Sequence, residues 1–132
     1  MASESELRTA LNIHLAAMPG STPIAWENVN YTPDGSVFIE QSLNPAEDRS
    51  NGVSVGSTDI LTGFMQLMIN EPKSVGIINY QGMIETIKSH FERNSSVTNG
   101  STRVSFTKIW ASSPIPSENY YRVPVSIRYT AT

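Results

Sequence analysis

Cysteine is absent from the 132 residues, which excludes a disulfide framework and any thiolate metal site. Charged residues make up 16% of the chain, well below the share of about 25% in an average soluble protein. No apolar run approaches the roughly 20 residues that a membrane-spanning helix needs. The N-terminus, Met-Ala-Ser-Glu-Ser-Glu-Leu, lacks the basic and apolar regions of a signal peptide. We therefore expect a protein that is made in the cytoplasm and has no membrane partner.

The length and the charge balance limit the number of domains and the class of binding partner. A chain of 132 residues is long enough for one core, so we expect a single domain over residues 1–132. Nine basic and twelve acidic residues give a net charge of −3. Nucleic-acid binding draws its affinity from clustered Lys and Arg, and only Arg122 and Arg128 share a predicted strand, on one face. Nucleic acid is therefore not expected as the main partner.

Two segments have helical periodicity. Ser3 and Glu6 form a capping-box pattern that predicts a helix start, and Pro19-Gly20 predicts its end. A second helix is predicted from Gly76 to about Asn94, where Gly82 suggests a close backbone approach. The apolar stripes of the two helices are Leu7, Leu11, Leu15 and Met18, and Tyr80, Ile84, Ile87 and Phe91.

The rest of the chain alternates with the period of strands. Pro124 lies in the last strand and indicates either an edge strand or a proline nitrogen that faces no neighbour. The first two strands are close enough in sequence to form a hairpin. The fold class is therefore α+β, with a mostly antiparallel sheet of about five strands and two helices packed on one face. The predicted strands are residues 24–31, 37–43, 57–70, 104–110 and 121–129.

Few residues of the sequence are candidates for catalysis, metal binding or base stacking. His14 and His90 lie beside the helical stripes without a carboxylate or second histidine at ligand spacing, so no metal site is predicted. Glu27 and Glu40 could face each other across the first hairpin, although solvated carboxylates are more common. Trp26 and Trp110 lack interleaved basic residues, which favours core packing over base stacking. We predict no catalytic residue, no cofactor and no enzyme activity.

One segment matches a catalytic motif in its letters. Gly52-Val53-Ser54-Val55-Gly56 reads Gly-x-Ser-x-Gly, but a nucleophile elbow needs a strand before it and a helix after it. Here a polar loop precedes the segment and a strand follows it. A small hydrolase is kept only as a remote alternative, and Gly52 and Gly56 are interpreted as flexible points of a loop.

Other features favour a protein that acquires partners. The strand from Ile60 to Ile69 is apolar on both faces, so each face is covered by the chain itself or by another subunit. Ordinary core packing and a subunit boundary are both open for its residues. The loop from Glu47 to Ser57 is expected to reach a neighbour, with a possible interface ion pair in Glu47-Asp48-Arg49. The predicted interface residues are Glu47, Asp48, Arg49, Val53, Val55, Leu61, Met65 and Leu67.

Three segments carry a family resemblance. Trp26-Glu27-Asn28-Val29, a strand that ends in Asn-Pro-Ala-Glu at residues 44–47, and the closing Val123–Tyr129 follow one another in the order of a known family. They resemble the tail terminator-like proteins of long-tailed phages, the minor tail protein U-like family, over nearly the whole chain.

The resemblance implies a structural protein of the virion, located at the head-proximal end of the tail. It implies a homo-hexameric ring that caps the tail tube, stops its polymerisation and offers a docking face for the head. The implied partners are the chain itself, the tail tube protein and a head-completion or neck protein, and DNA would be met only in the channel. A head-completion or neck protein, of similar size and β content, is the close alternative.

Overall fold

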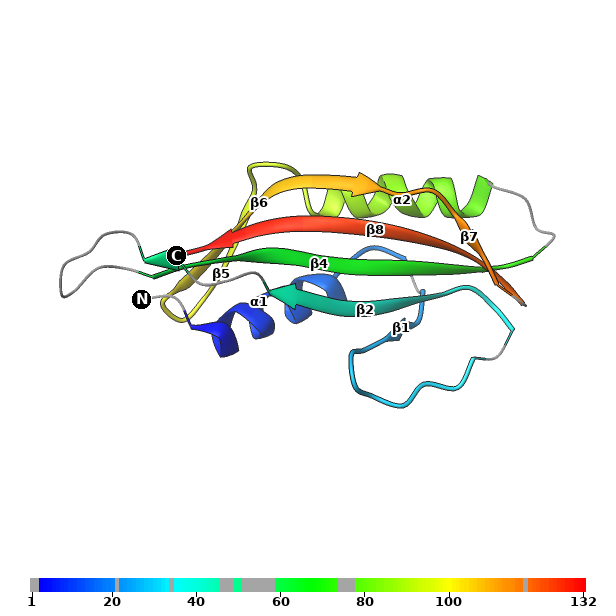
Figure 1. The fold of residues 1–132 in the computed structure, drawn as a ribbon, viewed down its shortest axis with the longest axis horizontal. Coiled ribbons are helices and arrows are strands. Elements are labelled where there is room, and N and C mark those ends of the chain that lie inside the picture. The colour runs from blue at the N-terminus through cyan, green and yellow to red at the C-terminus, as the bar shows by residue number, and fades with distance from the viewer. Residues whose placement is uncertain are drawn as a thin grey trace.

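The computed structural model describes residues 3–20, 22–33, 35–45, 49–50, 59–73, 78–117 and 119–132. The elements are α1 (Glu4–Ala16), β1 (Ile24–Ala25), β2 (Phe38–Pro45), β3 (Arg49–Ser50), β4 (Asp59–Pro72), α2 (Ile78–His90), β5 (Ser96–Asn99), β6 (Thr102–Ala111), β7 (Ile115–Pro116) and β8 (Tyr120–Ala131). The strands form one sheet with the order β1-β2-β4-β8-β6-β5 (Figure 1). In addition, β3 pairs with β4, and β7 pairs with β8.

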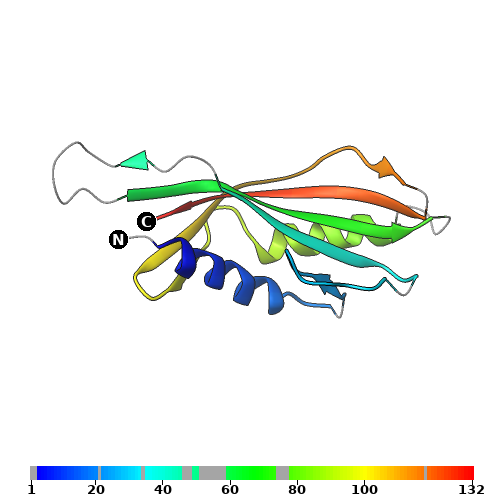
Figure 2. The same cartoon turned by 60° about the horizontal axis from the view of Figure 1, so that its bottom comes forward.

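The predicted fold class is confirmed: the protein is α+β, and both helices lie on one side of a mostly antiparallel sheet (Figure 2). The sheet has more strands than the sequence predicted. β3, β5 and β7 fall outside the five predicted strands. Each is only two to four residues long, too short for an alternating pattern to stand out from turn residues.

The N-terminus of α1 is capped differently from the predicted box. The Ser3 side chain accepts from the Glu6 amide, as predicted. The Glu6 carboxylate, however, accepts from the Ser101 and Thr102 hydroxyls, and the Ser3 amide donates to Thr102 Oγ1 at 2.9 Å. These bonds hold the start of α1 against the β5–β6 turn, and they lower the pKa of Glu6, chiefly through the Thr102 bond.

The core lies between the helices and the covered side of the sheet. The apolar stripe of α1 is fully buried at Leu7, Leu11 and Leu15, and Ile87 of α2 and Phe91, directly after it, are fully buried as well. They pack against alternate residues of the central strands, such as Ile39, Met65, Leu67, Ile69, Phe106, Val125, Ile127 and Tyr129. Gly82 does not show the expected close approach, because a Cβ there would meet no atom within 4 Å.

The predicted first hairpin is wrong. β1 ends at Ala25 and pairs with β2 in parallel, through Ile24–Ile39 and Ala25–Glu40. The chain leaves the strand at Trp26 in a turn, in which Val29 N donates to Trp26 O and Asn28 has a φ of 58°. A left-handed residue, which Asn tolerates, cannot continue a strand. The loop then returns the chain in the original direction.

β8 is a central strand between β4 and β6, so the edge-strand alternative for Pro124 is wrong. Its carbonyl accepts from the Ser112 amide, and its nitrogen therefore points to the same side. On that side β6 has ended at Ala111 and β7 pairs only with Tyr121 and Arg122. The missing donor thus falls just past the end of β6, opposite Ser112, where the regular ladder between β6 and β8 has already stopped.

Candidate assembly interface

One face of the sheet has no helix over it (Figure 2). We call it the open face and define it by the side chains that alternate with the core: Glu40 and Ser42 of β2, Phe64, Gln66, Met68 and Asn70 of β4, Lys108 and Trp110 of β6, and Arg122, Ser126 and Arg128 of β8. Phe64, Met68 and Trp110 are partly exposed and lie outside the core cluster. An apolar group on a helix-free face is typical of a surface that binds a partner.

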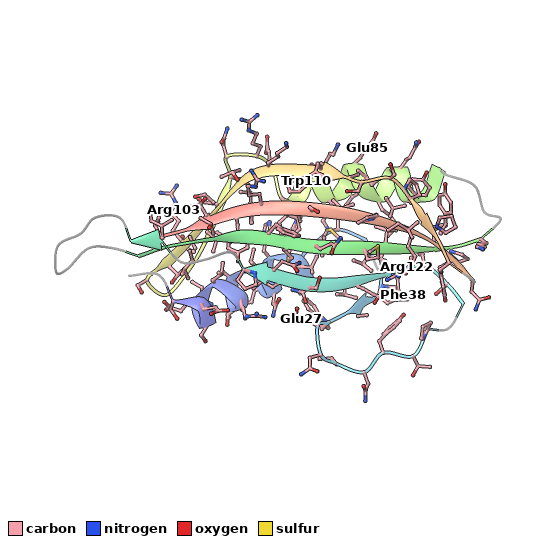
Figure 3. The ribbon with its side chains drawn as sticks, in the orientation of Figure 1. Glu27, Phe38, Glu85, Arg103, Trp110 and Arg122 are labelled. Carbon is pink, nitrogen blue, oxygen red and sulfur yellow. The ribbon has the colours of Figure 1, made fainter. Side chains whose placement is uncertain are left out.

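Trp110 is surrounded by cations on this face. Lys108 Nζ and Arg128 Cζ each lie 5.5 Å from the ring of Trp110, and the ring of Phe64 is 6.3 Å away. Figure 3 labels Trp110 on β6. The predicted core packing of Trp110 is therefore wrong, whereas Trp26 does pack against the core. A tryptophan with arginine and apolar neighbours has the composition of interface hot spots.

A polar network crosses three strands of the open face. Arg122 donates to Glu40 at 3.1 Å and to Asn70 at 3.0 Å, and Asn70 Nδ2 donates to Glu40 at 3.0 Å. The Arg122–Glu40 pair is partly exposed, so its net stabilisation is small. It does fix the positions of three side chains beside the apolar group.

Glu27 does not face Glu40. Its carboxylate accepts from Arg8 at 2.9 Å and from the Leu43 amide at 3.1 Å. The Arg8 bond, with that of Leu43, lowers the pKa of Glu27. The predicted carboxylate pair is wrong, because the loop after β1 carries Glu27 to the outer side of β2, beside α1.

The outer edge of β2 is closed by this arrangement. Ile39 N donates to Pro23 O, Leu43 N donates to the Glu27 carboxylate, and Pro45 has no N–H. Engaging or removing these donors discourages a further strand from pairing at this edge, which is a common protection against unwanted association.

The outer edge of β6 is only half closed. β5 pairs with residues 102–105, and Phe106 bonds Asn94 and Ser95. After the bulge between Phe106 and Lys108, β6 continues to Ala111 with ladder partners in β8 alone among the described residues. Ser112 N donates toward β8, so the alternating backbone groups of Ile109 and Ala111 point outward. This open edge was not found from the sequence, since it depends on where β5 ends.

The predicted interface residues lie in two places. Arg49 belongs to β3, whose two residues pair with Asp59 and Ile60 of β4 beyond the end of β8, where Leu61 pairs with Ala131. β3 and the start of β4 thus form a short hairpin, the β3–β4 arm, next to the end of β8 (Figures 1 and 2). Leu61, Met65 and Leu67 are buried in the subunit's own core. The remaining predicted residues, Glu47, Asp48, Val53 and Val55, lie outside the described residues, as does Ser54 of the Gly-x-Ser-x-Gly match.

His14 and His90 are the other polar group of note. Their rings stack with centroids 4.0 Å apart, and each Nε2 contacts the other residue's backbone oxygen. Among the described residues no group of three or more His, Cys, Asp or Glu side chains could hold a metal ion. A hollow bordered by Pro19, Gly82, Glu85, Thr86, Ser89 and His90 has one carboxylate in its described lining, and the Nε2 atom of its His90 contacts the His14 backbone oxygen.

No helix in the described part of the chain is long and apolar enough to cross a bilayer.

A family model described as "Phage tail terminator protein" matches residues 6–129. The chain belongs to the phage tail terminator family. Membership places it among structural proteins of the phage tail and locates it in the tail of the virion. No curated protein matches the chain.

Solved structures confirm the fold of this tail terminator family member. Eight chains of solved structures match it. One of them, whose title states no function, superposes with a TM-score of 0.78 at 22% identity, covering 98% of this chain and 96% of its own. The likeness supports the α+β architecture and says nothing of assembly.

Proposed function

We propose that this protein caps the phage tail tube as a six-membered ring, ends tube polymerisation and presents a docking face to the head. The observation that carries the proposal is the family match over residues 6–129. The partners are further copies of the chain, the tail tube protein and a head-completion or neck protein. The mechanism is geometric: one ring face is complementary to the last tube ring, and the opposite face does not accept another tube subunit.

The surface of the subunit supports an assembly role. A ring built by one repeated contact needs two different surfaces on each subunit. The chain has several candidates that differ in chemistry: an open face with Trp110 and cations, a half-open β6 edge, and the short β3–β4 arm. Its closed β2 edge limits the ways in which sheets can join. Leu61, Met65 and Leu67 stay candidates only through their nearness to the arm and the strand that carries it.

The test is to inactivate the gene in its source phage and to image the lysate by negative-stain electron microscopy. Tails of abnormal length without heads, beside filled heads, are the expected result, because nothing would stop tube growth. Complementation with the wild-type gene should restore normal virions. Normal-length tails beside unattached heads would indicate a neck or head-completion role instead. Normal virions would contradict any role in particle assembly.

A further inference from the structure

We propose that a hollow beside β1 and β2 binds the basic surface around Trp110 of a neighbouring copy of this chain. The inference rests on the ring proposed above and names one contact that builds it. The hollow has a volume of about 430 Å³, within the range of about 300–1,000 Å³ for sites that enclose a bound group. We call it the β2 hollow and define it by six of its lining residues, Trp26, Glu27, Val29, Tyr31, Phe38 and Glu40.

The walls of the β2 hollow are aromatic and stand apart from the core. Phe38 lies two residues before Glu40 on β2, on the side of the open face, and is outside the core cluster. Its ring lies 4.9 Å from that of Tyr31 and 5.3 Å from that of Tyr120. Val29 adds an apolar side chain that is 62% exposed. Such walls suit a Lys or Arg side chain, because aromatic rings attract the cation and apolar groups cover its stem.

The β2 hollow is also acidic. Its described lining contains the carboxylates of Glu27 and Glu40 and no cation, and each carboxylate pairs with an arginine from outside the lining. The bonds from Arg122 and Asn70 to Glu40 both end at Oε1. The Oε2 atom of Glu40 therefore has no partner among the described residues. A free carboxylate oxygen can accept a charge-assisted hydrogen bond from a further cation.

The surface around Trp110 has the opposite charge. Lys108 and Arg128 flank the ring and are exposed, and neither forms an ion pair with a described residue. Two cations around a tryptophan are complementary to two carboxylates among aromatic walls. Complementary charges of this kind select the partner and fix how it docks.

The two surfaces belong to different sides of the subunit. In Figure 3, Trp110 lies on β6, and Phe38 and Glu27 lie by β2, with β8 and β4 between them. β6 is three strand spacings from β2, about 14 Å at about 4.8 Å each. Within one subunit Lys108 is level with Asn44 of β2, four residues past Glu40. The basic surface of a subunit thus does not reach its own hollow.

A contact between these two surfaces is head-to-tail, the type that can close into a ring. It also fits the state of the β2 edge. The Ile39 and Leu43 amides at this edge are already engaged, which discourages the pairing of a further strand. Subunits that join on this side would therefore do so through side chains.

Charge changes at Val29 and Lys108 test the contact. Val29→Lys adds a cation to the lining of the hollow, and Lys108→Glu places an anion beside Trp110. Each single variant should weaken ring assembly about tenfold or more, because like charges then face each other across the contact. The double variant should recover most of this loss, because opposite charges face each other again. Sedimentation velocity against protein concentration measures the assembly.

Two further variants are the controls. Ile13→Lys makes the same kind of change on α1, at a side chain that is 63% exposed, and should assemble as the wild type does. Val29→Glu changes the same position without adding a cation and should also keep its assembly. The difference between Val29→Lys and Val29→Glu should shrink as salt is added, because salt screens exposed charges.

Three results would overturn the contact and leave the ring in place. They are normal assembly of Val29→Lys, losses that simply add in the double variant, and a loss in Ile13→Lys as large as that in Val29→Lys. A wild-type protein that forms rings neither in solution nor on tail tubes from the gene-inactivated lysate would overturn the proposed function, and this inference with it.

Discussion

The imidazole rings of His14 and His90 stack at 4.0 Å and exchange contacts with each other's backbone, Nε2 of His14 with the His90 oxygen at 2.7 Å and Nε2 of His90 with the His14 oxygen at 2.5 Å. A carbonyl oxygen only accepts, so each Nε2 carries its proton. The two oxygens belong to the last turns of α1 and α2, and the His14 oxygen also accepts from the Ala17 amide. The pair therefore joins the ends of the two helices, beside Phe91 and Phe106.

This pair predicts that stability falls in mild acid. Burial lowers the pKa of His14 below its ordinary value of 6.5. The unfolded chain then binds more protons than the folded one below that value, so the free energy of unfolding is constant above about pH 7 and decreases as pH falls through the unfolded-state pKa near 6.5. Urea unfolding at pH 7.5, 6.5 and 5.5 measures the effect.

The control is the double variant His14→Gln, His90→Gln, in which an amide N–H can replace each donor. It should unfold with a smaller change between pH 7.5 and 5.5 than the wild type. A wild-type unfolding midpoint that is the same at both pH values would contradict the lowered pKa of His14 in the stacked pair.

Gly63 and Gly82 should respond oppositely to alanine. Gly63 has a φ of 156°, and a Cβ there would lie 2.6 Å from the Asn44 oxygen and 2.9 Å from Pro45 Cα. Gly63→Ala should therefore lower the free energy of unfolding by about 2–3 kcal/mol. Gly82→Ala meets open space in α2 and should raise it by about 0.5–1 kcal/mol. Denaturant unfolding of both variants measures these changes. A lower free energy of unfolding in Gly82→Ala would instead support the close backbone approach expected from the sequence.

The helices and long strands were predictable because their signals are local. Leu7, Leu11 and Leu15 define the buried stripe of α1 at a helical period, and Val123, Val125, Ile127 and Tyr129 alternate along β8. The parallel pairing of β1 was not predictable, since it depends on the path of a loop and not on the strand's residues. The same limit applies to β5, which is identified by its partner β6 more than by its own composition.

The candidate interface, like the fold, could be predicted only in part from the sequence. The sequence placed Arg122 and Arg128 on one face of a strand, and the structure puts both on the open face. It could not place Trp110 beside Arg128, because strand order and the bulge after Phe106 set that contact. It also assigned no role to Glu27 at the β2 edge, where the side chain replaces a backbone acceptor that another strand would supply.

Glu27 should therefore stabilise the fold in a pH-dependent way. Its pKa is lowered from 4.5, chiefly by the Arg8 bond, so its contribution is present above about pH 4.5 and is lost as pH falls through the folded-state pKa. Glu27→Gln keeps an acceptor for the Leu43 amide and removes the charge. It should lower the free energy of unfolding at pH 7 by about 0.5–1 kcal/mol, as befits a partly exposed pair. The difference from wild type should disappear at the lowest pH at which both fold.

Removing the acceptor altogether should have a second effect. Glu27→Ala leaves the Leu43 amide on an uncovered sheet edge, so this variant should associate without limit at high concentration where Glu27→Gln does not. Light scattering against concentration compares the two. Equal behaviour would mean that the carboxylate contributes charge and packing but does not close the edge.

Trp110 and Trp26 should differ in what they contribute to the single subunit. Trp26 packs against the core cluster, whereas Trp110 lies on the open face between Lys108 and Arg128. Trp110→Ala removes two partly exposed cation–π contacts and should cost about 1 kcal/mol of unfolding free energy. Trp26→Ala removes buried area and should cost about 2–3 kcal/mol. Trp110→Phe, which keeps a ring for the cations, is the matched control. Urea unfolding of the monomeric subunit compares the free energies of unfolding of the three variants. An equal loss in Trp110→Ala and Trp26→Ala would mean that Trp110 packs in the core, and the open face would then lack its largest apolar side chain.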